Sequence, residues 1–228
     1  MFKFLFSLCI GICLLCSSCS VQPLSDEELY AKAVHNSHIV SRAKIHDLVT
    51  LNLKDPSVIY IGNKVLMATF HNVPKYYQKG QDVKLSIDVL WLVSYKELEN
   101  KLSENSNCSN KRIIQILGAK VGSSYSHLSL LLIDPNKLIR PAYLQDPFVN
   151  AMSLTLSSTD KNFERWFYDM KSKLDYPWTA LGYTYDWGDS GDNVYGVSEF
   201  ILRKDDYYHV LQTTTMDNFI SSECKLKY

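Results

Sequence analysis

The densest group of residues that could do chemistry lies between positions 183 and 199, where acidic and aromatic side chains alternate. Its members are Tyr183, Tyr185, Asp186, Trp187, Asp189, Asp192 and Glu199. Aromatic rings beside paired carboxylates are what a glycoside hydrolase needs, and Glu199 would act there with Asp186 or Asp189. Asp189 and Asp192 could also offer oxygen ligands to Ca²⁺, although the complete EF-hand pattern is missing.

A packing interpretation explains the same residues and is the preferred one. Alternation of Tyr183, Tyr185 and Trp187 predicts one buried face of a strand, with a turn beginning at Asp186. Glu199 would then lie on a second strand paired with the first. A ligand or partner surface is the second choice and catalysis the third.

Other catalytic and metal-binding patterns are weak. His35 and His38 have helical spacing, but one such pair cannot complete a zinc site, and H-E-x-x-H is missing. The segment around Ser123 and Ser124 does not match G-x-S-x-G, and no phosphate-binding or dinucleotide-binding glycine pattern is present. We therefore expect no metal and no cofactor.

The amino terminus carries an export signal. Residues 1–18 hold one charge, Lys3, followed by an apolar stretch and then Ser17 and Ser18, directly before Cys19. The apolar stretch is too short to remain as a spanning helix. The arrangement resembles the lipobox of bacterial lipoproteins, which predicts lipidation of Cys19.

Two details qualify this prediction of the anchor. The position three before the acceptor is usually Leu and here is Cys16, so a plain cleaved signal is the alternative. Ser20 follows the acceptor, and by resemblance to Gram-negative sorting this favours the outer membrane, facing the periplasm. Residues 1–18 would then be the signal, 19–24 a lipidated tether and 25–228 a single periplasmic domain.

Cysteine use agrees with export. After the signal and the lipidated position are set aside, Cys108 and Cys224 remain. In an oxidising compartment an isolated pair predicts a disulfide.

Composition limits the class of partner. Without Lys3, 23 basic residues face 24 acidic ones, so nothing predicts binding to nucleic acid. The mature chain of roughly 210 residues suits one domain, and it has no repeat or internal linker.

Hydrophobic periodicity and turn signals predict an α+β fold, mainly an antiparallel sheet covered by a few helices. The expected helices cover residues 26 to about 37, 95–102, 113–117 and, from a cap at Ser158 or Thr159, onward to about 174. The expected strands are a hairpin of 58–61 and 65–70, a long strand 83–94, a central strand 127–133, and a last hairpin of 195–203 and 207–213.

One segment supports a resemblance. Tyr-Pro-Trp-Thr-Ala-Leu-Gly-Tyr-Thr-Tyr-Asp-Trp-Gly at 176–188, followed by Gly-Val-Ser-Glu-Phe at 196–200, resembles a block of an uncharacterised bacterial family of secreted proteins and lipoproteins. Earlier marks include Leu117-Gly118, the run 135–141 and a helix with Arg165-Trp166-Phe167, so the resemblance spans about 83–220. It implies membership and no activity.

These observations favour a lipid-anchored, non-enzymatic module of the cell envelope, which contacts the membrane through its lipid and binds a protein or another envelope component. An immunity-type or protective lipoprotein is a specific form of this hypothesis. The alternative is a cell-wall or glycan hydrolase that uses Asp186 or Asp189 with Glu199.

Overall fold

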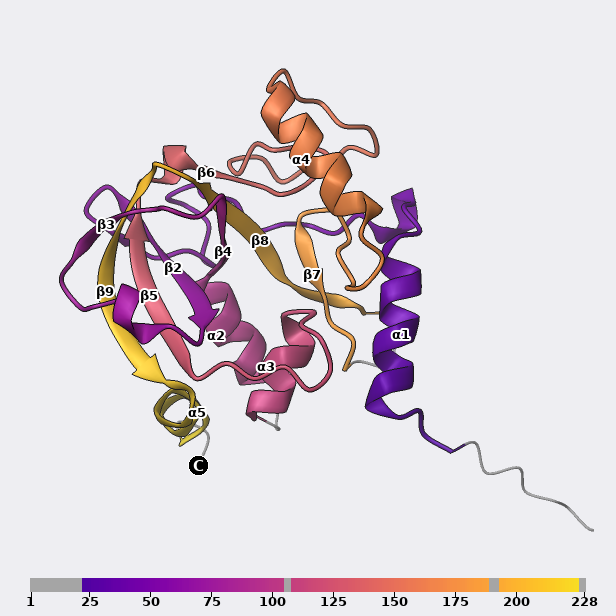
Figure 1. The fold of residues 1–228 in the computed structure, drawn as a ribbon, viewed down its shortest axis with the longest axis horizontal. Helices are drawn as coiled ribbons and strands as arrows, with labels where there is room; N and C mark the ends of the chain where they lie inside the picture. Colours follow the sequence, from indigo (N-terminus) through magenta and orange to yellow (C-terminus); the bar gives the residue numbers. More distant parts are fainter. Residues whose placement is uncertain (1–21, 105–107, 189–192, 226–228) are drawn as a thin grey trace, which may run out of the picture.

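The computed structural model describes residues 22–104, 108–188 and 193–225, without the side chains of residues 223–225. Within these ranges nine strands form one antiparallel sheet and five α-helices pack against it, which confirms the predicted α+β class (Figure 1). The strands are β1 (Tyr60–Ile61), β2 (Lys64–His71), β3 (Asp82–Lys84), β4 (Val89–Ser94), β5 (His127–Ile133), β6 (Leu138–Ile139), β7 (Tyr183–Tyr185), β8 (Tyr195–Arg203) and β9 (Tyr207–Thr215). The helices are α1 (Asp26–Ser37), α2 (Tyr95–Glu104), α3 (Asn110–Ile116), α4 (Lys161–Ser172) and α5 (Met216–Lys225).

The first hairpin forms where the sequence predicts it. β1 pairs with β2 across Gly62 and Asn63, and Gly62 has a φ of 62°, which a two-residue hairpin turn requires. β5 pairs along the whole of β2, from Val65 opposite Ile133 to His71 opposite His127. The predicted central strand 127–133 is therefore confirmed.

Two strand predictions are wrong, for a shared reason. The predicted strand 83–94 divides into β3 and β4, and the predicted last hairpin does not exist, because β8 pairs with β4 whereas β9 pairs with β3 and β5. Both segments bend at the same corner, where the Leu85 amide donates to Asp206 and the Lys204 amide donates to Asp88. The sheet thus curls until the segment 82–94 runs antiparallel beside the segment 195–209.

The curl encloses the main core. Alternate residues of five strands point inward, and their side chains are almost fully buried: Met67, Leu92, Leu131, Phe200 and Val210. A second cluster joins the outer face of β2 and β4 to α2, α3 and α5. α1 flanks β7, where Tyr30 meets Trp187 edge-on (Figure 1).

β2 and β4 separate soon after they meet. Their pairing consists of Met67 opposite Ser94 and Ala68 opposite Val93. Beyond these pairs β2 remains bonded to β5, and β4 remains bonded to β8 as far as Val89 opposite Arg203. The facing edges of residues 69–71 and 89–92 therefore diverge, which leaves a gap in the sheet.

Helix ends follow local capping rules. Ser25 and Glu28 form the predicted capping box of α1. α3 begins at Asn110, three residues earlier than predicted, because the hydroxyl of Ser109 accepts from the Arg112 amide. α4 is capped by Asp160 rather than by Ser158 or Thr159, and it buries Phe163 and Phe167 as its periodicity predicts.

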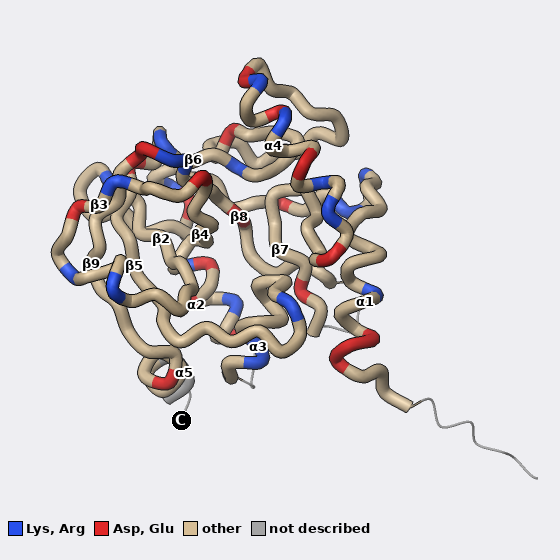
Figure 2. The backbone as a smooth tube through the Cα atoms, in the orientation of Figure 1, with Lys and Arg blue, Asp and Glu red and all other residues tan. Residues whose placement is uncertain are grey.

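The membrane-anchor prediction concerns residues outside the described ranges, since Cys19 and the signal lie in 1–21. Among the described helices, none combines the length and the apolarity that crossing a bilayer requires. Basic and acidic residues are interspersed over the domain, without a face of one sign (Figure 2).

Candidate functional site

β7 and β8 bring most of the predicted group together, but in the interior. Tyr183 lies opposite Ser198, and Tyr185 opposite Tyr195, so the acidic and aromatic residues lie on paired strands as the packing interpretation predicts. The exposed fractions are 1% for Tyr183, 0% for Asp186 and 9% for Glu199. Tyr185 and Trp187 are buried as well, and Asp189 and Asp192 lie outside the described residues. The described members therefore form no exposed surface.

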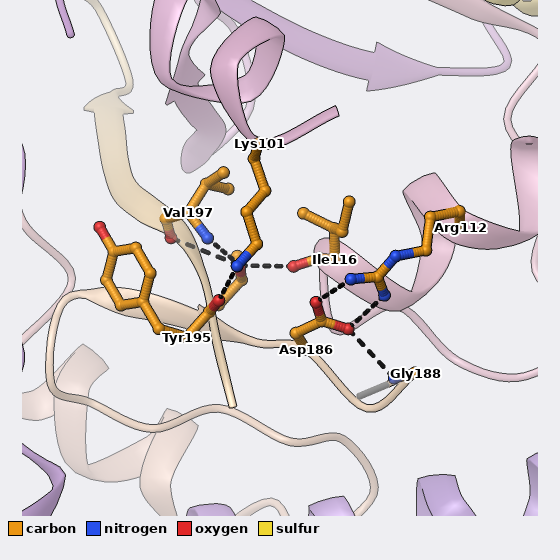
Figure 3. Close-up of polar contacts among 8 residues, drawn as sticks. Lys101, Arg112, Ile116, Asp186, Gly188, Tyr195 and Val197 are labelled. Carbon is orange, nitrogen blue, oxygen red and sulfur yellow. Dashed lines mark hydrogen bonds and ion pairs between the residues drawn. The ribbon is translucent and has the colours of Figure 1, made fainter. Parts of the chain in front are cut away.

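Asp186 is half of a buried ion pair. Its two carboxylate oxygens accept from Nη1 and Nη2 of Arg112 at 2.6 and 2.5 Å, and Oδ1 also accepts from the Gly188 amide at 3.1 Å (Figure 3). A bidentate guanidinium bond of this kind fixes the carboxylate as an acceptor. Asp186 consequently ties α3 to the turn after β7 and is not available as a general acid or base.

Glu97 forms a second buried network, which the sequence did not single out as a site. Its Oε1 accepts from the Tyr195 hydroxyl at 2.5 Å, and its Oε2 accepts from the Ser198 amide at 2.9 Å. Burial raises the pKa of Glu97 to about 7, although these hydrogen bonds lower it. Because the carboxyl is already bonded between α2 and β8, its role is structural.

A pocket of about 520 Å³ occupies the gap between β2 and β4. The diverging ends of the two strands supply Phe70 and Trp91, and the segment before β7 supplies Tyr176 and Trp178. Ile87 and Lys120 also line the pocket and are exposed, so it opens to the surface beside them. Apolar and aromatic side chains make up most of the wall, as in ligand pockets generally.

Two residues that line the pocket each carry a buried polar atom with no hydrogen-bond partner among the described residues. These atoms are Oε2 of Glu199 and Nε1 of Trp178, both inaccessible to solvent. Burial raises the pKa of Glu199 to about 8, and no other cause contributes to this shift. An unsatisfied buried polar group is costly, so this pair calls for an explanation.

His71 also lines the pocket but is fully engaged. Its Nδ1 accepts from the Val73 amide at 3.2 Å, so the ring proton is on Nε2, which bonds the Ser129 hydroxyl at 2.7 Å. Burial, with the neighbouring His127, lowers the pKa of His71 to about 4. The ring is therefore neutral at physiological pH, and because both nitrogens are hydrogen-bonded it has no free lone pair with which to act as a base.

Among the described residues, the paired carboxylates of a hydrolase are not assembled in the pocket, and Asp189, the other predicted partner of Glu199, lies outside the described ranges. Glu199 lines the pocket, whereas Asp186 is held by Arg112 and is not part of its wall. Within the described ranges no three His, Cys, Asp or Glu residues are grouped so that they could hold a metal ion.

Sequence reasoning selected Glu199 and missed Trp178, although both lie in the distinctive block 176–200. A signal for Glu199 was present, because it is the one charged residue from Tyr195 to Leu202 in a mainly apolar strand. The partners across the pocket, Phe70 and Trp91, come from distant strands and carry no local signal.

No known protein family, curated protein or solved structure matches this chain. The family resemblance based on residues 176–200 therefore stays a prediction.

Proposed function

We propose that the protein is a lipid-anchored binding module of the bacterial envelope, and that its domain takes a mainly apolar small molecule into the pocket between β2 and β4. The pocket of about 520 Å³ is the observation that carries this proposal. Its volume falls within the roughly 300–1,000 Å³ range of small-molecule sites.

The aromatic walls support an apolar ligand. Phe70, Trp91 and Tyr176 are partly buried and present ring surface to the pocket, so a ligand there would remove apolar area from water on both sides. Each Å² so buried contributes about 25 cal/mol before the cost of association. Because β2 and β4 separate after two residue pairs, such a ligand could bind between them without disrupting the main hydrophobic core that the curled sheet encloses.

The same residues favour binding over catalysis. Among the described residues a single carboxyl, Glu199, lines the pocket, whereas glycoside hydrolysis uses two on opposite sides of the scissile bond. His71 has both ring nitrogens occupied. An immunity-type role stays a hypothesis, and a pocket of this size suits a small molecule better than the surface of a protein toxin.

A lipid on Cys19 would fit this role. Residues 19–24 reach roughly 20 Å when extended, so the domain would work close to the bilayer, where apolar molecules concentrate. Incorporation of labelled palmitate that disappears in Cys19→Ala tests the anchor, whereas persistent labelling would move it to Cys16 or elsewhere.

The pocket itself is tested with 1-octanol as an uncharged probe. Trp91 and Trp178 line the pocket, so saturable binding should change the tryptophan fluorescence and release measurable heat in calorimetry. Val89 is a partly buried wall residue, and Val89→Phe should weaken binding at least tenfold because the added ring fills space.

Val121→Phe is the matched control, since Val121 is also partly buried but does not line the pocket. It should leave the octanol affinity unchanged, and thermal melts should show that both variants fold. Absence of saturable binding, or equal affinity in wild type and Val89→Phe, would overturn the proposed function.

A further inference from the structure

We propose that the pocket selects amphiphilic cations, molecules with an apolar body and an amine or ammonium group that pairs with the carboxylate of Glu199. This inference rests on the proposed function and specifies the ligand class. It starts from the position of Glu199, which β8 places opposite Val93 of β4, next to the point where β4 leaves β2.

Glu199 lacks a cation inside the protein. Among the described residues no Lys, Arg or His forms an ion pair with it, in contrast to Asp186, which has Arg112. Lys120 lines the pocket at its exposed rim, where water surrounds its charge. A buried carboxyl without a partner is a costly feature, and a bound cation would supply the missing partner.

The surroundings of Glu199 suit a cation rather than an anion. Tyr176 and Trp178 line the same pocket, and the pKa of the Tyr176 hydroxyl is raised mainly by burial and also by the nearby charge of Glu199. Aromatic faces attract amine and ammonium groups, and desolvation strengthens the attraction. Beside an ionised Glu199 a carboxylate ligand would meet a like charge, and the ammonium group of Lys120 lies only at the exposed rim.

Trp178 adds a second requirement. Its Nε1 is a buried donor without an acceptor, and it lies in the same wall as Glu199. A ligand hydroxyl, ether or carbonyl oxygen would satisfy it if the ring turns toward the pocket on binding, because Nε1 is closed to solvent in this structure. Amino alcohols and esters of choline with an apolar tail combine all three features.

Binding of a permanent cation should be coupled to loss of a proton. With its pKa near 8, Glu199 is mostly neutral at pH 7, and it must ionise to pair with the ligand. Affinity should therefore fall about tenfold for each pH unit below that pKa. The other titratable groups that face the pocket or Glu199 are His71, Tyr77, Lys120, Tyr125, Tyr176 and Tyr183.

His71 and the four tyrosines do not mimic the expected pH profile. Burial keeps His71 neutral above about pH 4 and raises the pKa of Tyr77 to about 12. The pKa values of Tyr125, Tyr176 and Tyr183 are raised as well, so these phenols stay neutral at pH 9.

The experiment compares three probes with one eight-carbon chain: octyltrimethylammonium, 1-octanol and octanoate. Calorimetry on the folded chain at pH 6 and pH 9 should show the ammonium probe at least tenfold tighter than octanol at pH 9. That advantage should shrink toward pH 6, while the octanol affinity stays constant. Glu199→Gln should remove the advantage and keep octanol binding.

Glu97→Gln is the matched control, because Glu97 is another buried carboxyl with a raised pKa but does not line the pocket. It should keep the preference for the ammonium probe. The pH profile of the wild type provides the same information if Glu199→Gln fails to fold.

The possible outcomes separate the two proposals. Equal affinity for the three probes, or tighter binding of octanoate, would overturn the preference for cations and leave the apolar pocket in place. Preference for the ammonium probe that survives in Glu199→Gln would also overturn it. Failure of every probe to bind would overturn both.

Discussion

At the scale of single residues, three buried carboxyl groups differ in the partners that they contact. Asp186 is paired with Arg112, Glu97 is bonded by neutral donors, and Glu199 has an unpartnered oxygen in the pocket wall. Of the three, only Glu199 has a carboxyl oxygen that is free to accept a hydrogen bond or an ion pair. The three carboxyl groups differ in their hydrogen-bond partners and not in residue type. The sequence pattern at 183–199 does not reveal these partners, so it could not distinguish a binding site from a packed core.

The Asp186–Arg112 pair should be among the strongest single polar contributions to stability. Asp186→Asn leaves the Arg112 guanidinium, 12% exposed in its side chain, without its counter-charge, so we expect a loss of about 3–5 kcal/mol in the free energy of unfolding. Urea denaturation measures it.

The control uses an exposed ion pair. Asp205 pairs with Lys84 at 2.7 Å at the surface, and Asp205→Asn should leave the free energy of unfolding nearly unchanged because water screens the pair. Equal effects of the two substitutions would show that the buried pair has no special role.

Glu199 should make the domain less stable as the pH rises. Its pKa is about 8 in the folded protein and near 4.5 when unfolded, so between these values the folded chain holds a proton that the unfolded chain has lost. Stability is then full below pH 4.5 and falls by up to about 1.4 kcal/mol per pH unit until about pH 8.

The window from pH 7 to pH 8 isolates this effect. Glu97, with a pKa of about 7, contributes mainly below it, and His71, with a pKa of about 4, acts in the opposite direction between pH 4 and 6.5. Urea midpoints should fall across the window in wild type and stay nearly level in Glu199→Gln. Parallel curves for the two proteins would contradict the assignment.

At the scale of elements, the sequence correctly predicted the turns, helix caps and helix faces that depend on interactions between neighbouring residues. The hairpin at Gly62, the capping box at Ser25 and the apolar face of α4 follow from turn and helix chemistry within a few residues. The corner at 204–206 differs, because its residues suit a hairpin equally well. Pairing with the distant segment 82–94 decides the outcome, and no single segment encodes it.

The gap between β2 and β4 is also determined by distant strand pairing and not by a local sequence signal. Residues 90–93 form a fully apolar run, which predicts a strand buried on both faces. That they line a pocket depends on where β2 diverges, which is set by its longer pairing with β5.

Gly196 should be indispensable to the contact between β8 and α3. A Cβ at this position would lie 2.2 Å from the Ile116 carbonyl oxygen and 2.2 Å from the Thr184 hydroxyl. The carbonyl belongs to the helix backbone and cannot move aside, so Gly196→Ala should cost about 2–3 kcal/mol. Thermal and urea denaturation measure the loss.

Gly62→Ala provides a comparison, since a Cβ there meets nothing within 4 Å. Its cost should be limited to about 1 kcal/mol for the left-handed backbone. A Gly196→Ala protein as stable as wild type would mean that β8 can shift away from α3.

At the scale of the molecule, a lipid anchor and a pocket impose different requirements. The proposed anchor would keep the domain near a bilayer, whereas the proposed binding pocket would have to stay open to exchange ligand while the rest of the fold holds together. β2 and β4 are joined by only two residue pairs beside the pocket, so the remaining stability must come from the helices and the sheet around it.

The predicted disulfide would strengthen the layer of helices α2, α3 and α5 that packs against the sheet. Cys108 follows the end of α2 by four residues, Cys224 belongs to α5, and α5 packs against α2. The side chain of Cys224 lies outside the described residues, so the bond remains a prediction. It would close a loop of about 115 residues and add about 4–5 kcal/mol in the chain-entropy model.

Peptide mapping by mass spectrometry without reductant should find Cys108 and Cys224 in one cross-linked fragment of the exported chain. Cys108→Ser, Cys224→Ser and the double variant should lower the melting temperature by the same amount, because each removes the same bond. Two thiols that titrate freely in the oxidised protein, or additive effects of the two substitutions, would contradict the pairing. Stability of the helical layer would then have to come from packing alone, with Phe219 and Leu98 as its buried contacts.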